Sequence, residues 1–179
     1  MPDEITQAIA AIRHGGVIAH ATEGVWGFAC DPFCEAAVQR ILTIKSRDVS
    51  KGLLLIGADV QAFAPELAAC AHRQRVEESW PGPHTWVLPN QRFASWITGA
   101  HDGVACRVPG HSQARALCAA FGGALVSTSA NRGGQPPAET EQQVQQAFAD
   151  EVDAILSGQV CAPGQASTIY DADGQVIRE

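Results

Sequence analysis

The sequence predicts a single α/β domain whose sheet mixes parallel and antiparallel strands. Its 179 residues suit one domain and can bury a substantial core. Stretches with the apolar spacing of helices alternate with short apolar runs that are typical of strands. The last two runs, residues 168–170 and 175–177, flank a turn at 171–174 and so predict an antiparallel hairpin. No repeat, linker or low-complexity segment interrupts the chain, so we expect residues 1–179 to form one domain.

In the first half of the chain, apolar spacing and glycines define the elements. Apolar residues recur at helical spacing from Ile5 to Ile12, after Pro2, and Gly15-Gly16 is expected to end that helix. The stretch 53–56 is apolar throughout, which predicts a strand buried on both faces. The other expected elements are a strand over 17–20, a Gly-punctuated loop or irregular strand over 22–30 and a helix over about 34–43.

In the second half, prolines and glycines mark the breaks. A helical region over about 60–78 is expected to stop at 80–83, because two prolines and a glycine there are incompatible with a regular helix. Thr140 is a typical N-cap for a helix over 140–148. The remaining expected elements are strands over 85–88, 104–108 and 124–127, a helix over 112–121 and a loop over 131–137.

Charge and cysteine content exclude several classes of function. The formal net charge of -7 argues against a protein whose whole surface grips nucleic acid, although a local basic cleft remains compatible with it. The six cysteines are scattered, and Cys30 and Cys34 lack the second pair that a zinc site needs, so we expect no metal site. Reduced thiols of this kind fit the cytoplasm. The chain has no signal peptide and no apolar run of about 18 residues, so we expect no contact with a membrane.

The only two lysines, Lys45 and Lys51, lie in one stretch that also contains Arg47. Lysine is normally spread over a protein surface for solubility, so this clustering points to a polyanion such as a phosphate chain. In an extended backbone, residues two apart share a face, so Lys45 and Arg47 could reach the same phosphates. The alternative is that these cations follow a helix end and complement its dipole, an effect of about 0.3–1 kcal/mol. The residues alone leave both interpretations open.

A second polar stretch follows the apolar run at 124–127. Ser127, Ser129 and Asn131 alternate, so an extended chain would place them on one side. Ligands of α/β sheets lie at the carboxyl ends of strands, and small hydroxyl residues let backbone N–H groups approach a phosphate. The alternative is an ordinary polar turn, in which Ser, Asn and Gly are common.

Arg107 lies within an apolar, strand-like run. A buried guanidinium is costly without an anionic partner, so we expect either a protein carboxylate or a bound carboxylate ligand beside it. The chain has neither a P-loop nor a dinucleotide-binding glycine motif, so any nucleotide is bound in another way. It also lacks the Gly-x-Ser-x-Gly motif that presents the serine nucleophile of a hydrolase triad, so the sequence gives no support for such a triad.

These stretches together resemble the YrdC/TsaC family, the threonylcarbamoyl-AMP synthases. The resemblance covers nearly the whole chain, with its motifs in the family's order and spacing. The matching blocks are Ala21-Thr22-Glu23-Gly24-Val25-Trp26-Gly27-Phe28-Ala29-Cys30-Asp31, Lys45-Ser46-Arg47, Trp80-Pro81-Gly82-Pro83-His84-Thr85, Cys106-Arg107-Val108-Pro109, Ser129-Ala130-Asn131 and Ser167-Thr168-Ile169.

The resemblance implies a YrdC-like domain with a twisted mixed sheet, flanking helices and a concave cleft. It implies a nucleotidyltransferase that forms threonylcarbamoyl-adenylate and pyrophosphate from L-threonine, bicarbonate and ATP, with Mg²⁺ accompanying the ATP. The product would pass to a downstream threonylcarbamoyl transferase complex that modifies position 37 of tRNA. The family likeness also allows weak binding of tRNA or structured RNA.

The resemblance assigns roles to particular side chains. The expected ATP-binding residues are Lys45, Arg47, Lys51, Ser129 and Asn131, of which all but Lys51 are also expected to act in catalysis. The expected threonine- and carbamoyl-binding residues are Thr22, Arg107, Ser127 and Ser167. Trp26, Trp80 and the apolar run after Lys51 are expected to help exclude water from the unstable carbamate.

Three positions depart from the family pattern, and two other functions stay open. Ala21, Asp48 and Ala166 stand where the family usually has proline. Asp48 is an acid beside the expected phosphate site, where it would pair with Arg47, bind the metal or change the affinity. The first alternative function is a structured-RNA-binding module without ATP turnover. The second is a carbamoyl-adenylate former of the kind found in hydrogenase-maturation proteins.

Overall fold

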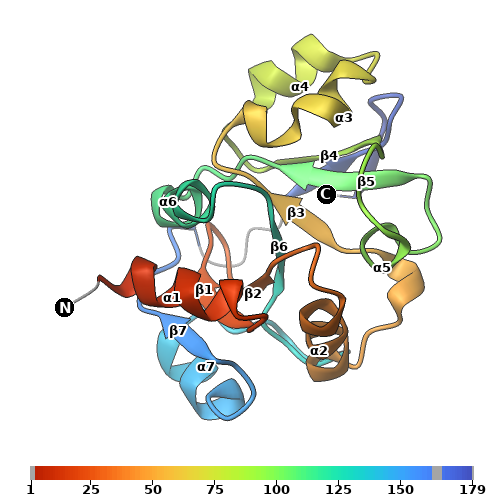
Figure 1. Cartoon of the computed structure of the whole chain (residues 1–179). Coiled ribbons are helices and arrows are strands. Elements are labelled where there is room, and N and C mark those ends of the chain that lie inside the picture. The colour runs from red at the N-terminus through yellow and green to blue at the C-terminus, as the bar shows by residue number, and fades with distance from the viewer. Residues whose placement is uncertain (1–2, 163–166, 179) are drawn as a thin grey trace.

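The computed structural model describes residues 3–162 and 167–178, so Pro2 and Ala166 lie outside the described residues. Within that part of the chain, nine strands form one sheet in the order β7-β1-β2-β6-β3-β5-β4-β8-β9 (Figure 1). The strands are β1 (Ile18–Ala21), β2 (Trp26–Cys30), β3 (Leu54–Ile56), β4 (His84–Pro89), β5 (Gly103–Arg107), β6 (Leu125–Ser129), β7 (Ala154–Leu156), β8 (Thr168–Tyr170) and β9 (Val176–Arg178). The pairs β1–β7, β3–β5 and β4–β8 are parallel, whereas pairs such as β2–β6 and β8–β9 are antiparallel. The predicted mixed sheet and the C-terminal hairpin are therefore confirmed.

Helices flank both sides of this sheet. They are α1 (Glu4–Arg13), α2 (Glu35–Lys45), α3 (Ala64–Ala68), α4 (Arg73–Ser79), α5 (Ser95–Thr98), α6 (Ser112–Phe121) and α7 (Glu141–Phe148), with the short 3-10 helices η1 (Val49–Lys51) and η2 (Val60–Phe63). The predicted N-cap of α7 is present, because the Thr140 side chain accepts the Gln143 N–H and Gln143 reciprocates. None of the helices in the described ranges is both long and apolar enough to pass through a bilayer.

The predicted helix over 60–78 is not continuous. Residues 60–63 form a 3-10 turn, α3 starts beside Pro65, and α4 begins only at Arg73. Proline has no N–H to donate and its ring clashes with the preceding turn, so the helix cannot run through Pro65 from Val60. The predicted helical region over 60–78 is therefore present, but it consists of three short helices instead of one.

Three elements differ from the expectation because tertiary pairing decides them. β2 is a regular strand, fully buried between β1 and β6, where the sequence predicted a loop or irregular strand. β7 is only three residues long and is held by parallel pairing with β1. α5 is a single turn that packs against η1 and β5. Segments this short carry too little periodicity to be read from sequence.

The backbone around the lysine stretch is not extended, so the interpretation that assumed an extended chain does not hold, whereas the alternative correctly placed these cations at a helix end. α2 runs as far as Lys45, and Ser46 then adopts a left-handed conformation with φ 49° that ends the helix. Arg47 N–H donates to Leu42 O across this turn. Lys45 and Arg47 therefore leave the chain in different directions rather than on one face of a strand.

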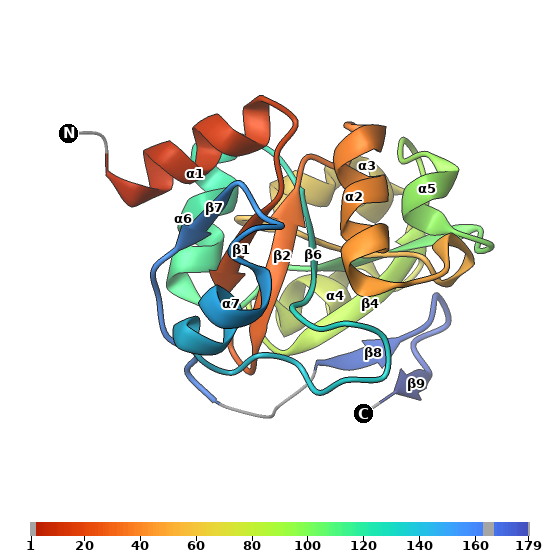
Figure 2. The same cartoon turned by 90° about the horizontal axis from the view of Figure 1, so that it is seen from below.

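The two faces of the sheet are covered differently, because successive residues of a strand point to opposite faces. On one face, α1 and α6 pack on a cluster that includes Ile18, Ala29 and Leu125. On the other face, residues such as Phe28 and Leu55 belong to a larger cluster under α2, α3, α4, α5 and α7. Figure 2 shows β7 at one edge of the molecule and the β8–β9 hairpin at the other. Since α1 and α6 pack near β1 and β7, the rest of their face is left for a site.

Candidate functional site

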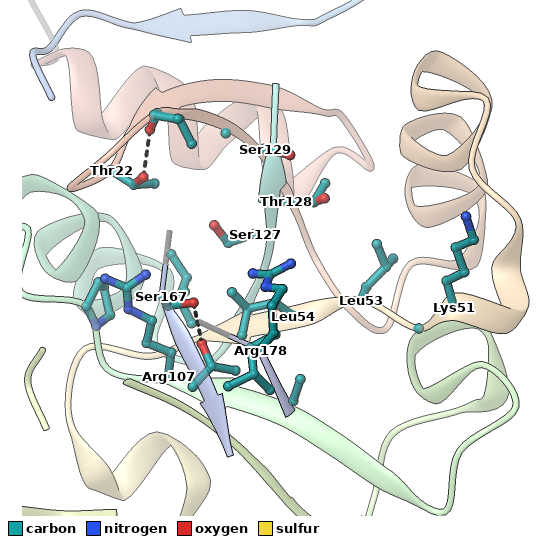
Figure 3. Close-up of a pocket in the computed structure, with 18 of the residues that line it drawn as sticks. Thr22, Lys51, Leu53, Leu54, Arg107, Ser127, Thr128, Ser129, Ser167 and Arg178 are labelled. Atoms are coloured by element: carbon teal, nitrogen blue, oxygen red, sulfur yellow. Dashed lines mark hydrogen bonds between the residues drawn. The ribbon is translucent and has the colours of Figure 1, made fainter. Parts of the chain in front are cut away.

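A pocket of about 700 Å³ lies on the part of the α1–α6 face that these helices leave uncovered (Figure 3). Ser127 and Ser129 follow the buried Leu125 on this face of β6, and both line the pocket. Leu54 lines it as well, and it is only half-buried, so the prediction that residues 53–56 are buried on both faces fails at Leu54. Several residues on this face, such as Ser127, Ser129 and Ala105, are small or polar where no helix covers them, which leaves room for a ligand.

One part of the pocket wall is cationic. Arg47, Lys51 and Arg178 all line it, and Figure 3 shows Arg178 reaching in from β9 toward Ser127. Arg47 Nη2 donates to Gly52 O at 3.0 Å, while its buried Nε has no hydrogen-bond partner among the described residues. Burial, and then the nearby Arg178, lower the pKa of Arg47. The guanidinium is thus partly desolvated and lacks a carboxylate partner in the described chain, as expected of a group that awaits an anion.

Asp48 caps the short helix that carries Lys51. Its Oδ1 accepts the Ser50 N–H at 2.8 Å, and this bond lowers the pKa of the exposed carboxyl. Asp48 is not among the described residues that line the pocket. Asp48, which departs from the family pattern, therefore stabilises the start of η1 beside the site.

Lys45 is buried behind the pocket wall rather than in it. Its Nζ donates to Asn131 Oδ1 at 2.8 Å and to the Ser129 carbonyl oxygen, and Ser129 Oγ donates to the same Asn131 Oδ1 at 2.7 Å. Lys45 is only 4% exposed. Neither Lys45 nor Asn131 is among the described residues that line the pocket. Burial, and then Arg47, lower the pKa of Lys45 to about 8. The structure brings Lys45, Ser129 and Asn131 together, and it joins them by direct hydrogen bonds.

Arg107 meets the predicted anionic partner, which is the carboxylate of Glu23. Arg107 Nη2 forms an ion pair with Glu23 Oε1, and Arg107 Nε donates to Gly82 O at 2.9 Å. Glu23 Oε1 also accepts the Gly110 N–H at 2.5 Å. Burial lowers the pKa of Arg107, and Glu23 opposes that shift. Arg107 and Glu23 both line the pocket, so the pair lies where a ligand would contact it.

Hydroxyl groups line the wall near Arg107. Thr22 Oγ1 donates to Val25 O at 2.6 Å, and the Ser167 and Thr85 hydroxyls are 2.9 Å apart, as the dashed lines of Figure 3 mark. Ser127 lies across the pocket from this pair. All four predicted threonine-binding residues, Thr22, Arg107, Ser127 and Ser167, therefore line one pocket.

Three pocket residues were missed as site residues. Glu23 and Thr85 stand inside sequence blocks that the resemblance already marked, so their position was a usable signal. Arg178 carried no signal, because an arginine in a short C-terminal strand has no distinctive spacing. Among the described residues, no group of three or more His, Cys, Asp or Glu side chains is arranged to hold a metal ion.

Comparisons with known proteins find a family model, a relative and solved structures that match this chain. A family model named Sua5/YciO/YrdC, described as telomere recombination, matches residues 10–179. A threonylcarbamoyl-AMP synthase of Xanthomonas oryzae pv. oryzae is 45% identical over 186 residues, which cover 98% of this chain and 97% of that protein. The crystal structure of P. abyssi Sua5 complexed with L-threonine is similar with a TM-score of 0.84 and 30% identity, over 96% of this chain. The chain spans about half, 52%, of that Sua5 chain. E. coli YciO has a TM-score of 0.84 at 23% identity, over 100% of this chain and 91% of that chain, which shows a common fold.

Proposed function

The chain belongs to the Sua5/YciO/YrdC family, and from this premise we propose that it is a threonylcarbamoyl-AMP synthase. It joins L-threonine, bicarbonate and ATP into threonylcarbamoyl-adenylate and releases pyrophosphate. The relative with this name is 45% identical over nearly the full length of both chains. This similarity also favours the synthase activity over that of a hydrogenase-maturation protein.

The observation that carries the proposal is that cationic side chains line one pocket at two separate places. Arg47, Lys51 and Arg178 form a cationic wall, and Arg107 lies apart from them beside Glu23 and the hydroxyls. The pocket volume of about 700 Å³ falls within the range of about 300–1,000 Å³ for small-molecule sites. A triphosphate and an amino-acid carboxylate are the two anions that the reaction must bring together.

The cationic wall binds the triphosphate of ATP. Arg47 donates in a planar fork that suits phosphate oxygens, and Lys51 and Arg178 add charge at the same wall. Mg²⁺ enters with ATP as part of the substrate and neutralises part of its charge. Ser129 orients the nucleotide from β6, and Lys45 and Asn131 hold Ser129 in place. Lys45 also adds a buried positive charge behind Ser129. This arrangement stabilises charge on departing pyrophosphate without a covalent nucleophile.

Threonine binds at the Arg107 side. Arg107 holds the substrate carboxylate with the donors that Glu23 leaves free, and Thr22, Ser127 and Ser167 contact the amino acid or its carbamoyl group. The threonine amine and bicarbonate condense to a carbamate with loss of water. A carbamate oxygen then attacks the α-phosphorus, the bond from this phosphorus to the oxygen that bridges it to the β-phosphate breaks, and pyrophosphate leaves. Trp26 and the apolar residues after Lys51 help keep water away from the carbamate.

The product serves the modification of position 37 in tRNA. We propose that it passes to a threonylcarbamoyl transferase complex in the cytoplasm, where free thiols such as those of this chain stay reduced. Weak contact with tRNA belongs to the same step. RNA binding without ATP turnover is disfavoured, because arginines elsewhere on the surface, such as Arg40, Arg73 and Arg132, are paired with carboxylates.

The test of the proposal is release of pyrophosphate by the purified protein given ATP, L-threonine and bicarbonate. Omission of threonine or of bicarbonate is expected to abolish release, and replacement of threonine by alanine is expected to reduce it strongly. Release that ignores both omissions would exclude a threonylcarbamoyl-AMP synthase. Salt-sensitive RNA binding with no such turnover would support the RNA-binding alternative instead.

A further inference from the structure

The position of Arg178 depends on an edge hairpin. In the described part of the chain, β9 pairs with β8 alone and forms the outer strand of the sheet. Its residues are exposed, including Val176 at 52% and Ile177 at 59%. A strand with so little buried surface opens locally at low cost in free energy. Arg178 is therefore held at the pocket only as firmly as the hairpin is held against the rest of the protein.

Charge repulsion acts against this placement. Arg178 is close enough to Arg47 to contribute to the lowered pKa of Arg47. Arg47 and Arg178 line the same pocket, so their like charges repel, and the partly buried setting of Arg47 reduces the screening by water. In the free protein this repulsion favours movement of β9 away from the pocket. A contact elsewhere on the hairpin must oppose it.

Such a contact exists at the turn end of the hairpin, where Arg75 of α4 contacts Trp86, Tyr170 and Gly174. We call these four residues the Arg75 clasp. The guanidinium carbon of Arg75 lies 5.2 Å from the centre of the Trp86 ring and 5.5 Å from that of Tyr170. The two rings are stacked with their centres 4.6 Å apart, and Arg75 Nη1 donates to Gly174 O at 3.2 Å. Trp86 is itself 2% exposed, so the clasp is anchored in the core.

Hydrogen bonds within the turn connect the Arg75 clasp to β9. Asp171 Oδ1 accepts the N–H groups of Asp173 at 3.0 Å and Gln175 at 2.8 Å, which ties the turn to the start of β9. Gly174 has φ +79°, and a Cβ added there would lie 2.7 Å from Arg75 Nη1. The positive φ favours glycine here, and a side chain at this position would also displace the end of Arg75. Because the turn is internally bonded, fixing one end restrains the short strand that follows.

We propose that Arg75 is a positioning residue for ATP binding: the Arg75 clasp holds the β8–β9 hairpin so that Arg178 stays beside Arg47 at the triphosphate wall. The inference rests on the proposed function for the identity of the ligand. Arg75 touches no substrate in this arrangement and acts through Arg178. The energy of a cation–π contact at an exposed site corresponds to about a fivefold change in an equilibrium constant.

The experiment measures the hydrogen exchange of the hairpin and the affinity for Mg–ATP separately. In Arg75→Ala, backbone amides of residues 168–178 are expected to exchange hydrogen faster than in the parent protein, while the rest of the sheet is unchanged. The dissociation constant for Mg–ATP, measured by calorimetry without threonine, is expected to rise about fivefold. In an Arg178→Ala background, the same Arg75→Ala change is expected to leave that constant unaltered, because the group through which Arg75 acts is gone.

Arg73→Ala is the matched control, since Arg73 is an exposed arginine of the same helix whose partner is Glu77. It is expected to change neither hairpin exchange nor ATP affinity. Arg75→Lys keeps the charge without the planar group and is expected to retain only part of the hairpin protection. Unchanged exchange at residues 168–178, or an equal loss of ATP affinity in both Arg178 backgrounds, would overturn the proposal. Absence of threonine-dependent pyrophosphate release with an intact Arg75 effect on ATP would instead refute the proposed function alone.

Discussion

Arg107 and Glu23 form an ion pair at the pocket wall, and the same Glu23 oxygen accepts the Gly110 N–H. Glu23 also accepts the N–H groups of Cys161 and Ala162 with its main-chain oxygen. One residue thus ties β5, the start of α6 and the segment before β8 to the loop after β1. The group proposed to bind the substrate carboxylate is fixed by a carboxylate of the protein, which positions it before the ligand arrives.

Breaking this pair from one side is expected to cost more stability than removing both charges. Arg107→Met leaves the Glu23 carboxylate without its cation and is expected to destabilise the fold by about 2 kcal/mol, whereas Arg107→Met with Glu23→Gln recovers most of that loss. Both variants are expected to lose threonine affinity by at least tenfold, because the carboxylate-binding group is absent from both. Urea unfolding and the KM for threonine measure the two effects. Equal stability of the single and the double variant would show that the pair is not a coupled unit.

Removing the guanidinium of Arg47 is expected to lower kcat/KM for ATP at least tenfold, which corresponds to about 1.4 kcal/mol in the barrier. The partly desolvated group supplies planar donors that Lys51 cannot replace. Steady-state pyrophosphate release by Arg47→Ala, with Arg73→Ala as a cation control from outside the pocket, tests this. A near-native rate in Arg47→Ala would remove Arg47 from the triphosphate wall.

Activity is expected to fall as pH rises through about 8, because the buried Lys45 ammonium loses its proton there in the free protein. In Lys45→Arg the side chain stays charged, so this decline is expected to disappear even if the maximal rate is lower. Profiles of kcat/KM for ATP between pH 6 and 10 provide the measurement. An identical decline in Lys45→Arg would assign it to another group.

Folding stability is expected to change with pH in the opposite direction from activity, which separates the two effects of Lys45. The unfolded side chain keeps its proton up to about 10.5, whereas the folded one loses it near 8, so the unfolded state binds more protons between these values. The Lys45 contribution to folding stability therefore increases with pH across this range. A loss of activity above pH 8 without any loss of folding stability would follow from the lost charge and not from unfolding.

His20 is expected to make the fold acid-sensitive. It is fully buried in β1, its Nδ1 lies 3.0 Å from Ala21 O, and burial lowers its pKa from 6.5 to about 4. The unfolded state binds the proton first, so stability is fully present above pH 6.5 and is lost as pH falls toward 4, by about 3 kcal/mol in total. His20→Asn is expected to be less stable at pH 7 but to lose less stability between pH 6.5 and 4. Urea unfolding at several pH values tests this, with the exposed His14→Gln as control.

The sequence predicted the class of fold because its elements depend on local patterns. Apolar spacing and Gly15-Gly16 delimited α1, and the turn at 171–174 marked the hairpin. Thr140 marked the start of α7 through a cap that needs only neighbouring residues. The failures at β2, β7 and α5 all concern short segments whose state depends on pairing or packing with other elements, such as β6 for β2 and β1 for β7, since their own length gives no periodicity.

By itself the sequence determined which chemistry is present: a lysine and arginine stretch, a Ser-x-Asn turn, a strand arginine and scattered hydroxyls, in an order that resembles one family. Only the tertiary structure decided which of these groups face a ligand. It turned Lys45 inward to Ser129 and Asn131, paired Arg107 with Glu23, and brought Arg178 from the last strand to the side of Arg47. The physical reason is that the direction of a side chain follows from helix ends and strand pairing. A left-handed Ser46 redirects Lys45 and Arg47, and the packing of an edge hairpin on α4 restrains Arg178.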